Sequence, residues 1–243
     1  MTPAVPARNL LLSALPSRRY GALLAELALV DMPFGTVLFE AEEVVGEVYF
    51  PVTGVISLVS SVDSQLSLEL GMIGSEGMAG IGVFLGARKA LSRAVVQVAG
   101  SMLVMRASAL RKECREGGIL DDLLRRYAYS LLVQISTSAV CNQFHTAEVR
   151  LARYLLMMHD RIRSSAFPLT QQFLSSMLGV RREGINRAAT ALQQRGLLSY
   201  RQGVITIVSR KRLEEHACEC YAEIKAEHRA LLRFLKAGRA SSG

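Results

Sequence analysis

Residues 169–198 constrain the fold of this chain more than any other stretch. Two short amphipathic segments lie on either side of Gly179, which can adopt the left-handed turn that ends a helix. Thr170 can cap the first helix, and a second helix is predicted from about Arg181 to Gln194. The apolar faces consist of Phe173, Leu174 and Met177 in the first helix and of Ile185, Ala188, Ala189 and Leu192 in the second. The pattern predicts a helix-turn-helix.

A hairpin is predicted directly after this helix pair. Two short β-prone runs within residues 196–208 flank Gln202-Gly203, a dipeptide suited to a tight turn. The hairpin would form a wing beside the second helix.

The basic charge of the chain is concentrated around the same region. The formal net charge is +8. Residues 147–213 carry 12 basic and 3 acidic side chains, whereas residues 1–146 carry 12 and 13, and residues 214–243 carry 5 of each. Such a concentration is typical of a segment that binds a polyanion, because each Lys or Arg that meets a phosphate releases condensed counterions. An amphipathic helix pair that packs against another protein is the alternative.

Polar side chains gather at the start and outer face of the second predicted helix. They are Arg181, Arg182, Glu183, Asn186 and Arg187. In a helix-turn-helix these positions reach base edges and phosphates in the major groove, so the sequence predicts double-stranded DNA as a partner.

The N-terminal half has a different pattern, with short β-prone runs separated by glycines. The runs are 36–39, 47–52, 55–59, 66–73, 94–98 and 102–105. They predict a small antiparallel barrel or roll. Within it, Leu66, Leu68 and Leu70 alternate with polar residues and are predicted to face inward. Before the runs, Leu10–Val30 carries a helical pattern in which Pro16-Ser17 is placed like a helix start.

A long helix is predicted between the two halves, from about Ile119 to Asn142. Its apolar residues occupy more than one face, which indicates packing against its own barrel and against a second copy of the chain. About 24 helical residues extend roughly 36 Å, farther than a small barrel. We therefore predict a homodimer; a helix buried within a monomer is the alternative. Asn142–Thr146 is a candidate hinge, and Glu148–Arg161 is predicted to resume as a helix.

In this order of elements the chain resembles the Crp/Fnr superfamily of bacterial transcription regulators. The resemblance is most specific in Leu169–Leu198, where Leu-Thr-Gln-Gln and Gly-Val-x-Arg-Glu-x-x-x-Arg are similar to the family's reading helix. It implies an α+β fold: an N-terminal antiparallel β-roll or jelly-roll sensor domain (residues 1–118), a long dimerisation helix with a hinge (119–146), and a C-terminal winged helix-turn-helix domain with a final helix (147–243).

The resemblance also implies roles for individual residues. Arg182, Glu183 and Arg187 would read bases, and their chemistry suits a half-site that contains G·C pairs. Thr170, Gln172 and Arg181 would hold phosphates, which fix register without reading sequence. Gly184 departs from the Ser or Thr usual in the family. Either this glycine makes the helix less stable, by roughly 1 kcal/mol relative to Ala, or it allows another backbone segment to approach the helix closely.

The expected effector pocket also departs from the family pattern. Relatives that bind cyclic nucleotides carry a glutamate for the ribose and an Arg-Ser or Arg-Thr pair for the phosphate. Here Gly80 stands at the glutamate position, and the pair is reversed as Ser92-Arg93. The sequence thus argues against cyclic AMP or GMP. Arg88, Lys89 and Arg93 could meet another anion, and a solvated loop is the alternative. Ser136-Thr137-Ser138 lies near the position where relatives touch the nucleobase, and control of the dimer register is the alternative role for these residues. The alternative is a module in which a cyclic nucleotide or other small anion gates DNA binding.

Metal and cofactor sites are not predicted. The four cysteines, Cys114, Cys141, Cys218 and Cys220, form no C-x-x-C pair and are too few for a disulfide scaffold. His216 and Cys220 could share a helix face, but no further ligand is evident near them in the sequence. No cysteine precedes Cys114 as an N-terminal iron–sulfur site would require, and His145 and His159 are interpreted as surface or packing residues rather than haem ligands.

Other functional classes have no support in the sequence. No nucleophile with a base, metal set or phosphate loop suggests an enzyme, and no apolar run approaches the roughly 18 residues of a membrane span. We expect a cytoplasmic protein, with RNA polymerase as a further candidate partner implied by the resemblance.

Overall fold

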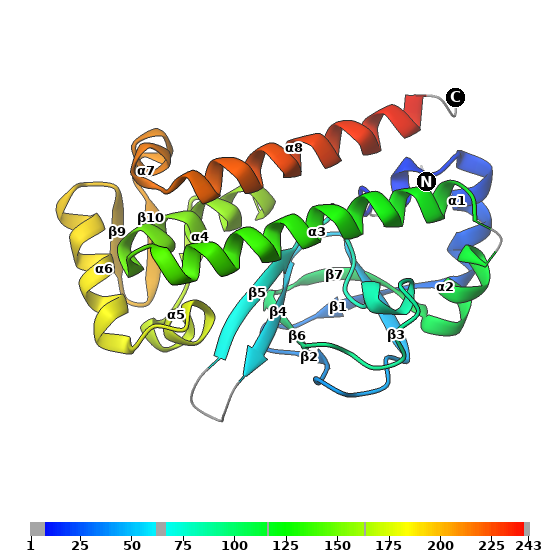
Figure 1. The fold of residues 1–243 in the computed structure, drawn as a ribbon, viewed down its shortest axis with the longest axis horizontal. Coiled ribbons are helices and arrows are strands. Elements are labelled where there is room, and N and C mark those ends of the chain that lie inside the picture. Colours follow the sequence, from blue (N-terminus) through cyan, green and yellow to red (C-terminus); the bar gives the residue numbers. More distant parts are fainter. Residues whose placement is uncertain (1–7, 62–66, 116, 163, 241–243) are drawn as a thin grey trace, which may run out of the picture. The chain divides into compact units, whose positions relative to one another are not determined.

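The computed structural model describes residues 8–61, 67–115, 117–162 and 164–240. Two compact units are present: Met1–Leu58, Met72–Leu132 and His228–Gly243 form one, and Val59–Gly71 and Val133–Glu227 form the other. The α+β class predicted from the sequence is confirmed (Figure 1). The predicted domain boundaries at residues 118 and 146 stay predictions.

The N-terminal strands form two sheets. In the first, with order β1-β7-β3, β7 pairs antiparallel with both neighbours; the second has the order β2-β6-β4-β5. Their bounds are β1 Leu27–Met32, β2 Val37–Phe39, β3 Glu47–Pro51, β4 Val55–Ser61, β5 Ser67–Ile73, β6 Arg93–Val98 and β7 Gly100–Arg106. Each of the six predicted β-prone runs overlaps one of these strands.

The helical pattern predicted for Leu10–Val30 is wrong only from Leu27 onward. α1 (Ser17–Leu23) does begin at the predicted start, after the short helix η1 (Leu12–Ala14). After η2 (Leu24–Glu26), however, the chain forms β1, which pairs along its whole length with β7. Hydrogen bonding to an available strand edge outweighs a weak helical periodicity.

The predicted burial of alternate leucines in β5 is also not observed. Leu68 and Leu70 are half-buried, whereas Gly71, Met72 and Ile73 at the end of the strand are buried. Leu66 lies outside the described residues. The strand is buried at its end rather than along one face.

The long helix α3 (Ile119–Phe144) continues two residues beyond the predicted end. Its first half packs on the segment that follows β5: the Tyr127 hydroxyl donates to the Met78 carbonyl at 2.9 Å, and a Cβ on Gly77 would lie 2.2 Å from the Tyr127 ring. This contact requires glycine at position 77. α2 (Ala107–Cys114) and η3 (Ile81–Val83) complete this part of the chain.

The remaining elements follow a short break at His145 and Thr146, within the predicted hinge. They are α4 Ala147–Ile162, β8 Ala166–Pro168, α5 Gln171–Leu178, α6 Arg182–Gln194, β9 Leu198–Arg201, β10 Val204–Ile207, α7 Arg210–His216 and α8 Glu219–Ala240. β10 is central in a sheet of order β8-β10-β9. The predicted helix-turn-helix and wing are therefore present.

Candidate DNA-binding surface

The helix pair α5–α6 is fixed by local signals in the sequence. The Thr170 side chain accepts a hydrogen bond from the Phe173 amide at 3.1 Å and caps α5. Gly179, with φ of 57°, ends the helix, and its amide donates to the Ser175 carbonyl. The buried residues that join the two helices are Leu174, Met177, Ile185, Ala188 and Leu192.

The start of α6 presents the three residues predicted to read bases. Arg182, Glu183 and Arg187 are exposed. A chain of side-chain hydrogen bonds orders this end: Arg182 Nε donates to Gln171 Oε1 at 3.4 Å, and Gln171 Nε2 donates to Asn186 Oδ1 at 3.1 Å. The side chains that would meet the bases are thus supported from α5.

The three residues predicted to contact phosphates, Thr170, Gln172 and Arg181, are exposed. Thr170 Oγ1 is already used in the cap, and Arg181 is the N-cap residue of α6. A hollow of about 560 Å³ opens beside them, lined by Thr170, Gln171, Gln172, Arg182, Tyr200, Gln202 and Gly203. The sequence analysis missed the contribution of Tyr200 and of the wing to this hollow.

The wing is held against the helices by Tyr200. Its amide donates to Gln193 Oε1 at 2.8 Å, and its hydroxyl donates to the Leu169 carbonyl at 2.9 Å. Burial raises the pKa of the Tyr200 hydroxyl, so that this donor stays protonated. Gln202 and Gly203, with φ of 50° and 76°, form the tight turn predicted for them.

Residues 149–216 match the family of the Crp-like helix-turn-helix domain. This part of the chain is a Crp-like helix-turn-helix domain. No curated protein matches the chain. Solved structures similar to it include a Crp/Fnr-family regulator from Eubacterium rectale (TM-score 0.69, 15% identity, 85% of this chain and 96% of that one). FixK2 from Bradyrhizobium japonicum has a TM-score of 0.64 at 17% identity, covering 79% of this chain and 98% of its own.

A third similar structure is the c-di-GMP-responsive regulator CLP of Xanthomonas campestris, with a TM-score of 0.59 at 17% identity, covering 78% of this chain and 97% of that one. These likenesses show the Crp/Fnr fold, and together with the Crp-like domain they confirm the resemblance predicted from the sequence. The matches are to transcription regulators, in agreement with the prediction that the chain is not an enzyme. Among the described residues, no helix is both long and apolar enough to span a membrane.

Gly184 of the Crp-like domain serves a close approach. A Cβ at this position would lie 2.6 Å from Val180 Cγ1, in the turn before α6. The close neighbour is thus the Val180 side chain and not a backbone segment, and the absence of a side chain at position 184 leaves room for it.

The basic residues of the Crp-like domain have three different environments. Arg181, Arg182, Arg187, Arg201 and Lys211 are exposed. Arg195 and Arg210 pair with Glu148 (3.3 Å) and Asp160 (2.6 Å). Arg150 and Arg153, in contrast, are buried in α4 with 8% and 5% exposure. The net charge of this segment therefore overstates the charge available to a polyanion.

The start of β5 contacts the end of α5 and the turn that follows it. Ser67 Oγ donates to the Ser176 carbonyl at 3.0 Å, and Leu68 lies against Gly179. No signal in the sequence indicates this contact between two segments more than one hundred residues apart.

The residues predicted for an effector pocket have separate surroundings. Gly80 has φ of 92°, and a Cβ on it would lie 2.9 Å from Val48 Cγ1. Arg93 pairs with Glu40 at 3.4 Å, Arg88 is exposed and Ser92 is buried. In the second half of α3, Ser136 is exposed and Thr137 is buried.

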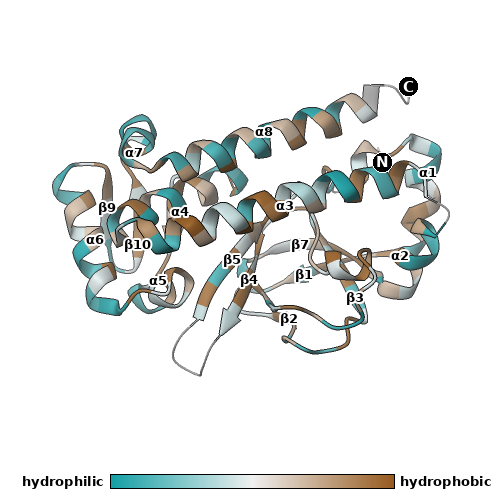
Figure 2. Ribbon diagram, in the orientation of Figure 1, coloured by the Kyte–Doolittle hydropathy of each residue, from teal (hydrophilic) through white to brown (hydrophobic). Residues whose placement is uncertain are grey.

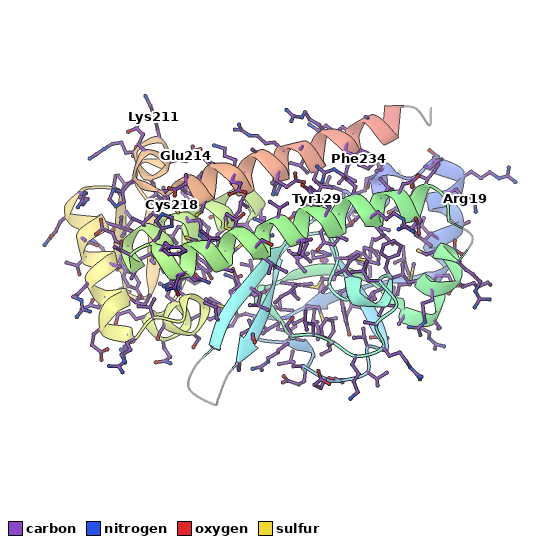
Figure 3. All side chains as sticks on the ribbon, viewed as in Figure 1. Arg19, Tyr129, Lys211, Glu214, Cys218 and Phe234 are labelled. Carbon is purple, nitrogen blue, oxygen red and sulfur yellow. The ribbon has the colours of Figure 1, made fainter. Side chains whose placement is uncertain are left out.

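Among the described residues, four side chains of types that can ligate a metal lie together at the borders of the Crp-like domain: Cys141, His145, Cys218 and Cys220. Cys218 lies where α7 passes into α8 (Figure 3). The hydrogen bond from Cys218 and the charge of Arg153 lower the pKa of the Cys141 thiol. His216, which the sequence analysis weighed with these cysteines, instead pairs with Glu148 at 2.7 Å. Sequence spacing alone could not find Cys141 and His145 as partners of Cys218 and Cys220.

Proposed function

We propose that the protein is a homodimeric transcription regulator that binds a palindromic DNA site through α6. The observation that carries the proposal is the exposed group Arg182, Glu183 and Arg187 at the start of the second helix of a Crp-like helix-turn-helix domain. Arginine can donate two hydrogen bonds to guanine O6 and N7, and glutamate can accept from cytosine N4. The hydrogen-bonding groups of these three side chains therefore suit contacts with base edges as well as with phosphates.

We assign the hollow beside this group of residues to the binding of a DNA phosphate. Its lining combines the Thr170 cap, Gln172 and the wing turn, with Arg182 as a charged member. The uncharged donors around this concave surface suit a phosphate, which fixes the register of the reading helix beside the base-reading Arg182. Arg201 adds positive charge on the wing.

A homodimer is supported by an apolar line on α3. Tyr129, Leu132, Val140 and Phe144 are exposed by 57%, 59%, 52% and 75% and recur at intervals that keep them on one helix face. Polar and apolar residues alternate along this helix (Figure 2). Such a seam buries its apolar side chains when a second copy packs on it, as in a coiled coil. Two-fold symmetry then places the reading helices roughly 34 Å apart, in successive major grooves.

The sensor pocket is proposed to be altered for cyclic nucleotides. The positive φ of Gly80 and the nearness of Val48 leave no place for the glutamate that holds a ribose, and Arg93 is engaged with Glu40.

The break at His145 and Thr146 is the proposed hinge through which an effector sets the spacing of the reading helices. The proposed setting is the cytoplasm, with RNA polymerase as a partner.

Fluorescence anisotropy on a family-type palindromic duplex and a scrambled one, at two salt concentrations, tests the proposal. We expect tighter binding to the palindrome and a loss of that preference in Arg182→Ala. Lys211→Ala is the matched control: it removes one charge from α7 (Figure 3), away from α6, and keeps the preference. Base reading would be contradicted if the wild type bound both duplexes with equal affinity and also bound no operator selected from random DNA more tightly than the scrambled duplex.

Sedimentation analysis tests the dimer separately. Val140→Glu places a charge in the seam and should produce monomers. Leu91→Glu, at a position that is 90% exposed and outside α3, should leave the dimer intact. A Val140→Glu variant that remains dimeric would exclude the α3 seam.

A further inference from the structure

Four side chains from two distant segments converge at the borders of the Crp-like domain. Cys141 lies in the last turn of α3, His145 directly follows this helix, and Cys218 and Cys220 flank the start of α8. Their ligand atoms all lie within 4.8 Å of one another. Cys141 Sγ and Cys218 Sγ are 3.6 Å apart, and Cys220 Sγ and His145 Nδ1 are also 3.6 Å apart.

We propose that Cys141, His145, Cys218 and Cys220 bind one structural Zn²⁺ ion. Three thiolates and one imidazole form a ligand set typical of closed, tetrahedral zinc sites. With Zn–S and Zn–N bonds of about 2.3 and 2.0 Å, tetrahedral ligands lie about 3.8 Å apart for two sulfurs and about 3.6 Å apart for sulfur and nitrogen. The observed separations are close to both values, so the side chains need little movement to coordinate an ion.

A carboxylate orients the histidine for this role. His145 Nε2 lies 3.3 Å from Glu219 Oε1. When Nε2 carries the proton and donates to the carboxylate, Nδ1 has its lone pair free, and Nδ1 is the atom that lies beside the Cys220 sulfur. Metal-binding histidines commonly have such a partner on the second ring nitrogen.

The charge around the site is complementary to a zinc–thiolate centre. Three thiolates, a neutral imidazole and Zn²⁺ carry a net charge of −1. Arg150 and Arg153 are buried in α4, and both interact electrostatically with Cys141. In the described part of the chain neither forms an ion pair with a carboxylate; Arg150 donates to the Leu178 carbonyl and Arg153 to Ser138 Oγ. A buried cation without a carboxylate is costly, and an anionic centre would offset that cost.

The positions of the ligands indicate what the ion would do. Cys141 and His145 precede the matched domain (residues 149–216), and Cys218 and Cys220 follow it. One ion would thus join the two ends of the domain and hold the last turn of α3 against the first turn of α8, as a disulfide across a long loop would. Where the protein also binds DNA as proposed above, the ion would lie at the proposed hinge and would limit how far α6 can move relative to the end of α3.

Metal analysis of the purified full chain tests the site. Protein produced in zinc-supplemented medium and purified without chelators should contain close to one zinc per chain. Cys141→Ser and Cys220→Ser should each lose most of it. Cys114→Ser is the matched control, because Cys114 lies at the end of α2 and outside the cluster, and it should retain the metal.

Cobalt provides a readout that does not depend on whether a variant folds. Wild-type apoprotein titrated with Co²⁺ should develop the visible bands of tetrahedral cobalt together with sulfur-to-cobalt charge transfer, and Zn²⁺ should abolish these bands. Wild-type protein that binds neither ion more tightly than Cys141→Ser would overturn the proposal. So would a Cys141–Cys218 disulfide in peptide maps of the freshly isolated protein.

The outcome is distinguishable from that of the proposed function, because metal content is measured without DNA. A zinc protein that fails to select an operator contradicts only the DNA-binding proposal. A protein that selects an operator and lacks zinc contradicts only the metal site.

Discussion

Helices α4 and α6 belong to the same basic segment of the sequence but use their arginines in opposite ways. α6 exposes Arg182 and Arg187 at the surface, whereas α4 buries Arg150 and Arg153. The difference follows from the neighbours. One face of α6 is exposed, while α4 contacts α5, α6 and α7 and is buried from Arg150 to Met158. A count of charges along the chain therefore indicates a polyanion partner without showing which charges are available to it.

The largest effect that this comparison predicts is on folding. Arg150→Ala should lower the free energy of unfolding by about 2–4 kcal/mol, because it leaves a cavity and removes the donor to the Leu178 carbonyl. Arg187→Ala, on exposed α6, should change it by no more than about 0.5 kcal/mol. Urea unfolding of the two variants measures both values, and equal losses would remove the distinction between the helices.

The reverse ranking is expected for DNA. Arg187→Ala should weaken binding to the specific duplex by about 1–3 kcal/mol and leave non-specific binding nearly unchanged, since it removes a base contact. Anisotropy titrations with the specific and scrambled duplexes measure the two losses. Lys211→Ala should instead weaken both slightly and equally; the same behaviour in Arg187→Ala would mean that this arginine only attracts phosphates.

A third prediction concerns how tightly α6 packs at its start. Gly184→Ala should not yield the roughly 1 kcal/mol that alanine usually gains over glycine in a helix, because its Cβ would lie 2.6 Å from Val180 Cγ1. Thermal unfolding measures the effect. In a Val180→Ala background the same substitution should become stabilising; a gain in the wild type as well would show that the turn is loosely packed.

The smallest effect is a pH dependence in α4. Burial, and then the charge of Arg210, lower the pKa of His159 below its ordinary value of 6.5. The neutral imidazole is therefore favoured in the folded state, and its contribution to stability is complete above pH 6.5 and declines as the pH falls toward the folded pKa. His159→Gln should flatten the stability profile in that range. An unchanged profile would assign the acid sensitivity to other groups.

The parts of the fold that were predicted correctly depend on local signals. Thr170 and Gly179 mark the ends of α5 through interactions within a few residues, and Gln202-Gly203 does the same for the wing. β1 was missed because its structure depends on β7, about seventy residues away along the chain. Local periodicity carries no information about such a partner.

The candidate sites, too, could be predicted from the sequence only where their residues are close together along the chain. The base-reading residues are neighbours in the sequence and could be found from one motif, whereas the proposed zinc ligands come from two distant segments. In the sequence Cys218 and Cys220 lack further ligands, and His145 is an isolated histidine in a hinge. Only the folded chain brings them together with Cys141.

Selection of binding sites from a pool of random DNA duplexes tests the central claim most directly. The account predicts that the wild-type protein enriches a palindrome whose half-sites lie about one helical turn apart and contain G·C pairs, and that Arg182→Ala relaxes the selection within those half-sites. Enrichment of a site without two-fold symmetry, or of no site at all in the presence or absence of candidate effectors, would contradict a dimer that reads DNA through α6.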